Sequence, residues 1–191
     1  MGGWALKTDQ VEHWAWQSKV FSPEQCKWII NFCKKKGLMT AGVDVQRPKK
    51  NKKIRDSRVC WLTHNECPDI YAKLTDVINE LNSKFFHFDL FGFMEDIQFT
   101  EYRAPGGHYG KHIDRASKSS ARKLSVTLQL SDPSTYEGGD LEIYIGDKPD
   151  KAKREQGCCN VFPSYVLHQV TPVTKGTRYS LVAWIGGPDF K

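Results

Sequence analysis

The chain has 191 residues, of which 39% are hydrophobic and 12% aromatic, and its formal net charge is +6. This length allows one domain with a substantial core, and the composition excludes an intrinsically disordered chain. No apolar run approaches the roughly 20 residues of a membrane-spanning helix, and the first residues lack a secretory signal, so we expect a cytoplasmic protein without a membrane partner.

The first predicted helix lies within residues 21–37, FSPEQCKWIINFCKKKG. Ser22 is expected to be the N-cap, with Pro23 at the first helical position and Gln25 completing a capping box. Gly37 is expected to end the helix in the left-handed conformation. Apolar residues spaced i, i+3, i+4, i+7 predict one buried face, formed by Cys26, Ile29, Ile30 and Cys33.

A basic region follows, because residues 27–58 contain eleven Lys or Arg and only two Asp, a local charge of +9. Its middle, residues 42–53, has no hydrophobic period and predicts a charged loop. The positive charge could attract an acidic protein or a nucleic acid; the alternative is a solvated helix end followed by an ordinary loop. Residues 54–62, IRDSRVCWL, then return to the composition of a strand.

The second predicted helix covers residues 68–86, with a stripe formed by Ile70, Leu74, Val77, Ile78, Leu81 and Phe85. From residue 94 onward the pattern changes to short strands separated by Gly and Pro turns. The candidate strands are DIQFTEY, KLSVTLQL, DLEIYI, CCNVF, VLHQV and RYSLVAWI. Helices followed by strands predict a single α+β domain over residues 1–191, with helical support at about 20–90 and a β-sandwich or barrel at about 94–187.

The six cysteines contain no CxxC pair and no Cys/His zinc spacing. Cys158 and Cys159 are adjacent and poorly placed to bond each other. We therefore expect reduced and mostly buried thiols rather than a disulfide framework.

The stretch HYGKHIDR (108–115) places His112 and Asp114 two residues apart. On a strand these side chains share one face, whereas Ile113 would point into a core. A divalent ion would still need another ligand, and His168, on a candidate strand far along the chain, is the histidine we select. Two histidines and one carboxylate leave three coordination positions open, as in non-heme Fe(II) oxygenases.

An anion clamp is predicted ten residues after His168. If residues 177–185 form a strand, Arg178, Ser180 and Trp184 share a face. A guanidinium with a hydroxyl two residues away suits a carboxylate, because Arg offers paired donors in a fixed fork.

Taken together, these motifs resemble those of the Fe(II)/2-oxoglutarate-dependent dioxygenases, particularly the prolyl 4-hydroxylase-like group. The similarity covers residues 16–187 and rests on YRAPGGHYGKHID, YEGGDLEIY and FPSYVLHQVTPVTKGTRYSLVAW. It implies a double-stranded β-helix (jelly-roll) core with N-terminal helices packed on one sheet.

The resemblance also implies roles for individual residues. His112, Asp114 and His168 would hold Fe(II), and Arg178 would bind the distal carboxylate of 2-oxoglutarate. Other residues implied to contact the cosubstrate are Tyr102, Ser180, Gln129 and Trp184, and residues implied near the substrate are Arg55, Ser57, Trp61 and Tyr109. Two positions depart from the family pattern, since Gln129 replaces a tyrosine and Ser57 replaces an acidic residue of a close relative.

We therefore expect an oxygenase that uses Fe(II), 2-oxoglutarate and O2, supported by ascorbate, to hydroxylate a prolyl residue of a peptide or protein. The substrate would lie under the 42–57 loop and favour acidic flanking sequence. Alternatives are the same chemistry on a free amino acid or a nucleic-acid base, or a non-catalytic binding module. A nucleic-acid partner is disfavoured because the basic segment lacks interleaved aromatics. The sequence gives no indication of the oligomeric state.

Overall fold

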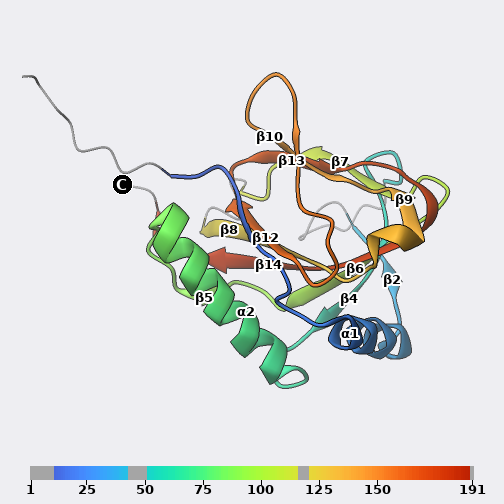
Figure 1. Ribbon diagram of the computed structural model, residues 1–191, viewed down its shortest axis with the longest axis horizontal. Coiled ribbons are helices and arrows are strands. Elements are labelled where there is room, and N and C mark those ends of the chain that lie inside the picture. The colour runs from blue at the N-terminus through green and yellow to red at the C-terminus, as the bar shows by residue number, and fades with distance from the viewer. Residues whose placement is uncertain (1–10, 43–50, 116–120, 190–191) are drawn as a thin grey trace, which may run out of the picture.

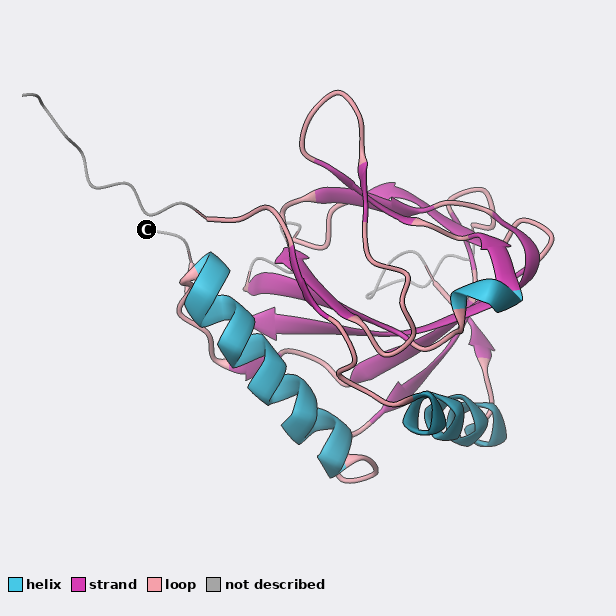
Figure 2. Cartoon of the chain, viewed as in Figure 1, coloured by secondary structure: helices cyan, strands magenta, loops and turns pink. Residues whose placement is uncertain are grey.

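The computed structural model describes residues 11–42, 51–115 and 121–189. In these ranges two β-sheets face each other, and two helices cover the outer side of the larger sheet (Figures 1 and 2). This is the layered arrangement predicted from the order of helices and strands. No helix in the described part of the chain has the length and apolar character needed to cross a membrane.

Helix α1 (Pro23–Lys36) begins as predicted. The Ser22 hydroxyl accepts from the Gln25 backbone N–H, and the Gln25 side chain accepts from the Ser22 backbone N–H. The expected left-handed end is wrong: Gly37 has φ +97° but ψ 138°, because the chain passes directly into the extended strand β2 (Met39–Thr40).

Helix α2 (Pro68–Leu81) continues into a π-helical turn, η1 (Asn82–Phe86). Its buried stripe packs with that of α1 against the larger sheet, so both helices share one core with the strands. The buried helical residues are Cys26, Ile29 and Cys33 of α1 and Ile70, Tyr71, Leu74, Val77, Ile78 and Leu81 of α2.

The larger sheet runs in the order β1-β12-β8-β14-β6-β4-β2, and β5 and β9 also pair with β14. Its long central strand, β14, pairs with β6 on one side and β8 on the other. The bounds are β1 Ala15–Gln17, β4 Arg58–Leu62, β5 Gly92–Phe93, β6 Ile97–Arg103, β8 Arg122–Gln129, β9 Tyr136–Gly138, β12 Cys159–Pro163 and β14 Val173–Gly186.

The two faces of the larger sheet differ in chemistry. Because side chains alternate along a strand, one face presents apolar residues to the helices. These include Ile97, Phe99, Leu124, Val126, Leu128, Leu181, Ala183 and Ile185. The register places the intervening polar residues together on the other face, where they meet the smaller sheet: Gln98, Thr100, Tyr102, Ser125, Thr127, Gln129, Arg178 and Ser180.

The smaller sheet has the order β11-β10-β13-β7-β3. Its strands are β3 Arg55–Asp56, β7 His108–His112, β10 Leu141–Tyr144, β11 Asp150–Lys151 and β13 Leu167–Val170. The segment 54–62, expected to be one strand, is divided: β3 pairs with β7 in this sheet, and β4 pairs with β6 in the larger one. The chain crosses between the sheets at Ser57, whose carbonyl accepts from the Ala41 N–H.

The predicted loop at 42–53 lies mostly in residues 43–50, which are outside the described part of the chain. Residues 51–54 form a turn in which the Asn51 carbonyl accepts from the N–H groups of Ile54 and Arg55.

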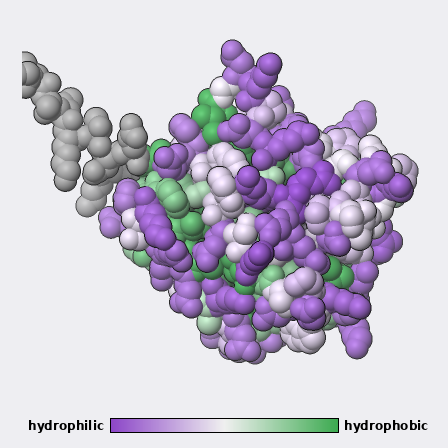
Figure 3. Space-filling model, viewed as in Figure 1, coloured by the Kyte–Doolittle hydropathy of each residue, from purple (hydrophilic) through white to green (hydrophobic). Residues whose placement is uncertain are grey.

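All six cysteines are free and buried, which confirms the prediction of reduced core thiols. The face of the molecule in Figure 3 is largely hydrophilic, with smaller apolar groups between the charged side chains. Most of the apolar residues therefore lie between the layers rather than on this surface.

Candidate active site

The two histidines of the predicted metal site lie opposite each other in the smaller sheet. His112 ends β7 and His168 lies on β13, and the two residues are direct partners in the antiparallel register. Asp114 follows beyond the end of β7, at a bend whose backbone is held by the Ser164 carbonyl. The expectation that Ile113 points into a core is wrong: its side chain is 45% exposed, because the strand has already ended.

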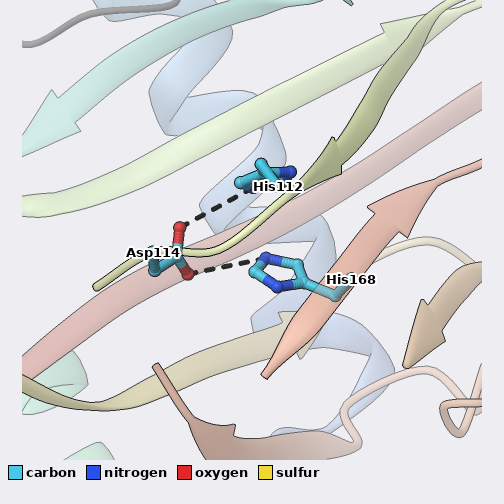
Figure 4. A group of neighbouring side chains, drawn as sticks. All are labelled: His112, Asp114 and His168. Atoms are coloured by element: carbon cyan, nitrogen blue, oxygen red, sulfur yellow. Dashed lines mark ion pairs between the residues drawn. The ribbon is translucent and has the colours of Figure 1, made fainter. Parts of the chain in front are cut away.

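The three side chains converge on one point (Figure 4). Asp114 Oδ1 lies 3.7 Å from His112 Nε2, and Asp114 Oδ2 lies 3.5 Å from His168 Nε2. The candidate ligand atoms all lie within 4.8 Å of one another. Two imidazoles and a carboxylate at this spacing fit a divalent transition metal and leave room for further ligands.

Backbone carbonyls fix the tautomers of both histidines. His112 Nδ1 lies 2.8 Å from the Gly110 carbonyl oxygen, and His168 Nδ1 lies 2.9 Å from that of Val166. Because a carbonyl only accepts, each Nδ1 carries a proton, and each Nε2 faces Asp114. This is the orientation that metal-ligating histidines commonly have.

The protonation states also suit metal ligands. Burial and the neighbouring His168 lower the pKa of His112 to about 4, so its imidazole is neutral at neutral pH. Burial alone would raise the pKa of Asp114, but the two imidazoles and the Ser125 hydroxyl outweigh this effect and lower it, so the carboxylate is ionised.

Arg178 has the environment of an anion-binding residue. Its side chain is 1% exposed and forms no ion pair with any described carboxylate. Nη1 lies 3.5 Å from the Ser180 hydroxyl, and Nη2 has no hydrogen-bond partner among the described residues. Burying an unpaired guanidinium is costly, so the arrangement is best explained by an anion that binds there.

Gly139 leaves the space for the Arg178 stem. Its φ is +63°, and a Cβ there would lie 3.1 Å from Arg178 Cδ and 2.9 Å from the side chain of Val173. The Gly138-Gly139 turn, which lies in the YEGGDLEIY motif, therefore serves both a left-handed backbone and close packing.

A cavity of about 300 Å³ between the sheets connects the metal-site residues with Arg178. Six other residues selected from the sequence line the same cavity: Arg55, Trp61, Tyr102, Tyr109, Ser180 and Trp184. Gln129 and Ser57 do not line it. Gln129 is buried opposite Ser180 in the register, and Ser57 accepts a 2.9 Å hydrogen bond from Arg55 Nε.

An aromatic stack supports His112 from the side of β3. The Tyr109 ring lies 3.6 Å from the His112 ring between centroids, and the Arg55 guanidinium lies 4.5 Å from the Tyr109 ring. Arg55 Nη2 also donates a 2.7 Å hydrogen bond to Gln98 Oε1. Burial raises the pKa of Tyr109, which keeps its hydroxyl protonated.

Several cavity residues escaped the sequence analysis. Gln98 and Thr127 belong to strands in which polar and apolar residues alternate, a pattern that was available in the sequence. Arg122 and Glu95 also line the cavity and form a 2.7 Å ion pair, but their spacing of 27 residues gives no local signal.

These features define a class: a protein of two facing β-sheets with a cavity that contains a two-histidine, one-carboxylate cluster able to hold a metal ion and a buried arginine whose donor is unpaired among the described residues. Comparison with known proteins places the chain within that class. Residues 97–186 match the model of the 2OG-Fe(II) oxygenase superfamily. A PKHD-type hydroxylase from Gloeothece citriformis is 30% identical over 173 residues, which cover 87% of this chain and 74% of that protein. The chain belongs to the 2OG-Fe(II) oxygenase superfamily and, within it, to the PKHD-type hydroxylase family.

Local similarity to other relatives is higher but shorter. A PKHD-type hydroxylase from Prochlorococcus marinus is 48% identical over 81 residues, 42% of this chain and 37% of that protein. The matched segments cover 37% to 52% of this relative and of four further PKHD-type hydroxylases, about half their length or less.

A solved structure supports the fold. The Trichoplax adhaerens prolyl hydroxylase, in complex with a hypoxia inducible factor oxygen degradation domain peptide fragment, superposes with a TM-score of 0.76. The superposition covers 92% of this chain and 84% of that chain at 18% identity. The predicted jelly-roll core is thus confirmed.

Proposed function

We propose that this protein is an Fe(II)- and 2-oxoglutarate-dependent oxygenase that hydroxylates a prolyl residue in a peptide or protein. One observation carries the cosubstrate assignment: the buried Arg178, with an unpartnered Nη2, lies in the same cavity as His112, Asp114 and His168. A dicarboxylate that reaches from the metal site to Arg178 would supply the missing counter-charge.

The chemistry of bound iron and 2-oxoglutarate is to reduce dioxygen and place one oxygen atom on the substrate, with succinate and CO2 released. The chain supplies the surroundings. His112 and His168 direct their Nε2 atoms toward Asp114, whose lowered pKa keeps its carboxylate negatively charged. Phe162, Leu141 and Val170 line the cavity with apolar surface that excludes water.

Arg122 and Glu95 are the residues that we propose for peptide binding. Arg122 lies 4.2 Å from the Trp184 ring and forms the ion pair with Glu95. Arg122 Nε and Glu95 Oε2 are nonetheless buried without a hydrogen-bond partner in the described structure. A peptide group offers one acceptor and one donor, so it would satisfy both atoms. The peptide fragment bound to the Trichoplax adhaerens prolyl hydroxylase supports the same substrate class.

Acidic flanking sequence is the second part of the substrate proposal. Lys52, Arg58 and Arg103 line a second cavity of about 270 Å³, where Asp56 and Glu101 neutralise part of their charge. The excess of cations would attract an acidic peptide segment, and salt would weaken this attraction. Peptide affinity that does not change between low and high salt would contradict the preference.

The test is succinate formation from 2-oxoglutarate with Fe(II) and ascorbate, with and without proline-containing peptides. Wild type is compared with His168→Ala, and hydroxyproline is identified in the product. Turnover that needs His168 and rises with peptide supports the proposal. Turnover that needs His168 but ignores peptide keeps the chemistry and favours a free amino acid or a nucleic-acid base as substrate. No turnover and no binding of 2-oxoglutarate would favour a binding module.

A further inference from the structure

Two buried serines hold the Asp114 carboxylate. Ser125 Oγ lies 2.6 Å from Asp114 Oδ2 and 3.0 Å from Ser164 Oγ. Ser125 is 1% exposed and Ser164 is fully buried. Ser125 lies on β8 directly opposite Trp184 of β14, and Ser164 lies in the turn between β12 and β13.

The direction of these hydrogen bonds follows from the number of protons. Ser125 donates its single hydroxyl proton to Asp114 Oδ2. The Ser125 oxygen then remains as an acceptor, and Ser164 must be the donor of the contact between the two hydroxyls. The relay therefore runs from Ser164 through Ser125 to Asp114.

The turn that carries Ser164 also contacts another predicted ligand. The Ser164 carbonyl accepts from the Asp114 N–H at 3.0 Å and from the Arg115 N–H at 2.8 Å. Two residues later, the Val166 carbonyl accepts from His168 Nδ1. Residues 163–166, closed by the bond from the Val166 N–H to the Pro163 carbonyl, thus hold both the backbone and carboxylate of Asp114 and the imidazole of His168.

We propose that Ser125 and Ser164 are positioning residues of the metal site, an inference that rests on the metal-dependent function proposed above. Ser125 fixes the rotation of the carboxylate, so that Oδ1 stays on the side of His112. The 163–166 turn fixes the separation of Asp114 from His168. Outer partners of this kind typically change metal affinity by about 10- to 100-fold when they are removed.

The first test measures Mn(II) binding to the metal-free full chain by calorimetry, without cosubstrate. We expect Ser125→Ala to weaken Mn(II) binding by about 10- to 100-fold, and we expect Ser164→Ala to weaken it as well. Ser131→Ala is the matched control. Ser131 is also buried and accepts a 2.7 Å hydrogen bond from the Tyr179 N–H, but it lies six residues further along the chain, roughly 20 Å from Ser125 if extended.

A second measurement separates positioning from a loss of folding. The thermal midpoint of each metal-free variant is recorded, and we expect similar decreases for Ser125→Ala and Ser131→Ala. Ser125→Thr keeps the hydroxyl and should bind Mn(II) with wild-type affinity. The Co(II) complex of Ser125→Thr should show the wild-type absorption spectrum, whereas the Co(II) complex of Ser125→Ala should show a different one.

Two outcomes would overturn the inference, and they are distinguishable. If wild type binds Mn(II) and both alanine variants bind it equally well, the serines do not position the site and the proposed oxygenase function is untouched. If wild type does not bind Mn(II), the metal site itself fails, and the proposed function fails with it.

Discussion

At the level of single residues, the cavity contains buried polar atoms that have no hydrogen-bond partner in the described structure. Buried donors and acceptors nearly always have hydrogen-bond partners in folded proteins. Arg178 Nη2, Arg122 Nε and Glu95 Oε2 lack them among the described residues, although each residue lines the same cavity. The unpaired donor of Arg178 therefore favours an anion, and the donor of Arg122 with the acceptor of Glu95 favours a peptide group, as in the function proposed above.

Replacing Arg178 tests the anion receptor. A hydrogen bond to a charged group contributes about 1.5–3 kcal/mol, so Arg178→Gln should weaken 2-oxoglutarate binding by about 10- to 150-fold. Arg178→Lys retains the charge but loses the paired donors, so we expect an intermediate effect. Affinity is measured by calorimetry on Mn(II)-loaded protein, and Mn(II) affinity serves as the control. Equal 2-oxoglutarate affinity in all three proteins would exclude Arg178 as the receptor.

The lowered pKa of His112 predicts a pH-dependent stability of the metal-free protein. In the unfolded chain this histidine takes up a proton near pH 6.5, whereas the folded protein does so only near pH 4. The unfolded state therefore binds more protons between these values, and stability is lost as the pH falls from 6.5 to 4. Asp114, whose pKa is also lowered, extends the loss to lower pH.

We expect the thermal midpoint of the metal-free wild type to fall through this range. His112→Gln removes the titrating group, so the thermal midpoint of this variant should fall less steeply with decreasing pH. His64→Gln is a matched control, because it removes a histidine outside the cavity. Parallel pH profiles for wild type and His112→Gln would show that the imidazole is not kept neutral by burial.

At the scale of elements, local signals predicted the helices well and the short strands poorly. Ser22 and Gln25 make a capping box within four residues, so the sequence alone predicts where α1 begins. Strands β1, β2 and β5 have two or three residues each and exist only because a partner strand lies beside them. The division at Ser57 also depends on partners, since β3 joins β7 of the smaller sheet and β4 joins β6 of the larger one.

The capping box gives a prediction for α1. Ser22→Ala removes the acceptor for the Gln25 N–H and should cost about 1 kcal/mol of stability. For a chain of this size the thermal midpoint should fall by about 2–4 °C. The helix lies on the far side of the larger sheet from the cavity, so Mn(II) affinity should not change (Figure 1). Ser22→Asp retains an acceptor, so its thermal midpoint should equal that of the wild type. If Ser22→Ala lowered the Mn(II) affinity, the separation of α1 from the metal site would be contradicted.

At the scale of the whole molecule, strand pairing explains how much of the candidate site could be predicted from the sequence. The spacing of His112, Asp114, His168 and Arg178 indicated the chemistry, because those residue types have few other uses in that combination. Arg122, Glu95 and the serine relay could not be found, because they meet the site only after β8, β12 and β14 pair. The candidate metal and anion residues could thus be predicted from their spacing in the sequence, whereas the residues around them are brought to the site only by strand pairing.

Ligand binding should stabilise the whole molecule, because the cavity joins the two sheets. A ligand that binds only the folded state, present at a concentration 100 times its dissociation constant, raises the free energy of unfolding by about 2.7 kcal/mol. This increase corresponds to a rise of about 5–11 °C in the thermal midpoint. We expect such a rise with Mn(II), and a further one when 2-oxoglutarate is added. His168→Ala should lose the Mn(II) effect, whereas Arg178→Gln should keep it and lose most of the 2-oxoglutarate effect. The cosubstrate would reach from the metal site to Arg178, so His168→Ala and Arg178→Gln should affect the two shifts differently. A variant pair that failed to separate the two shifts would contradict the division of the site into a metal end and an anion end.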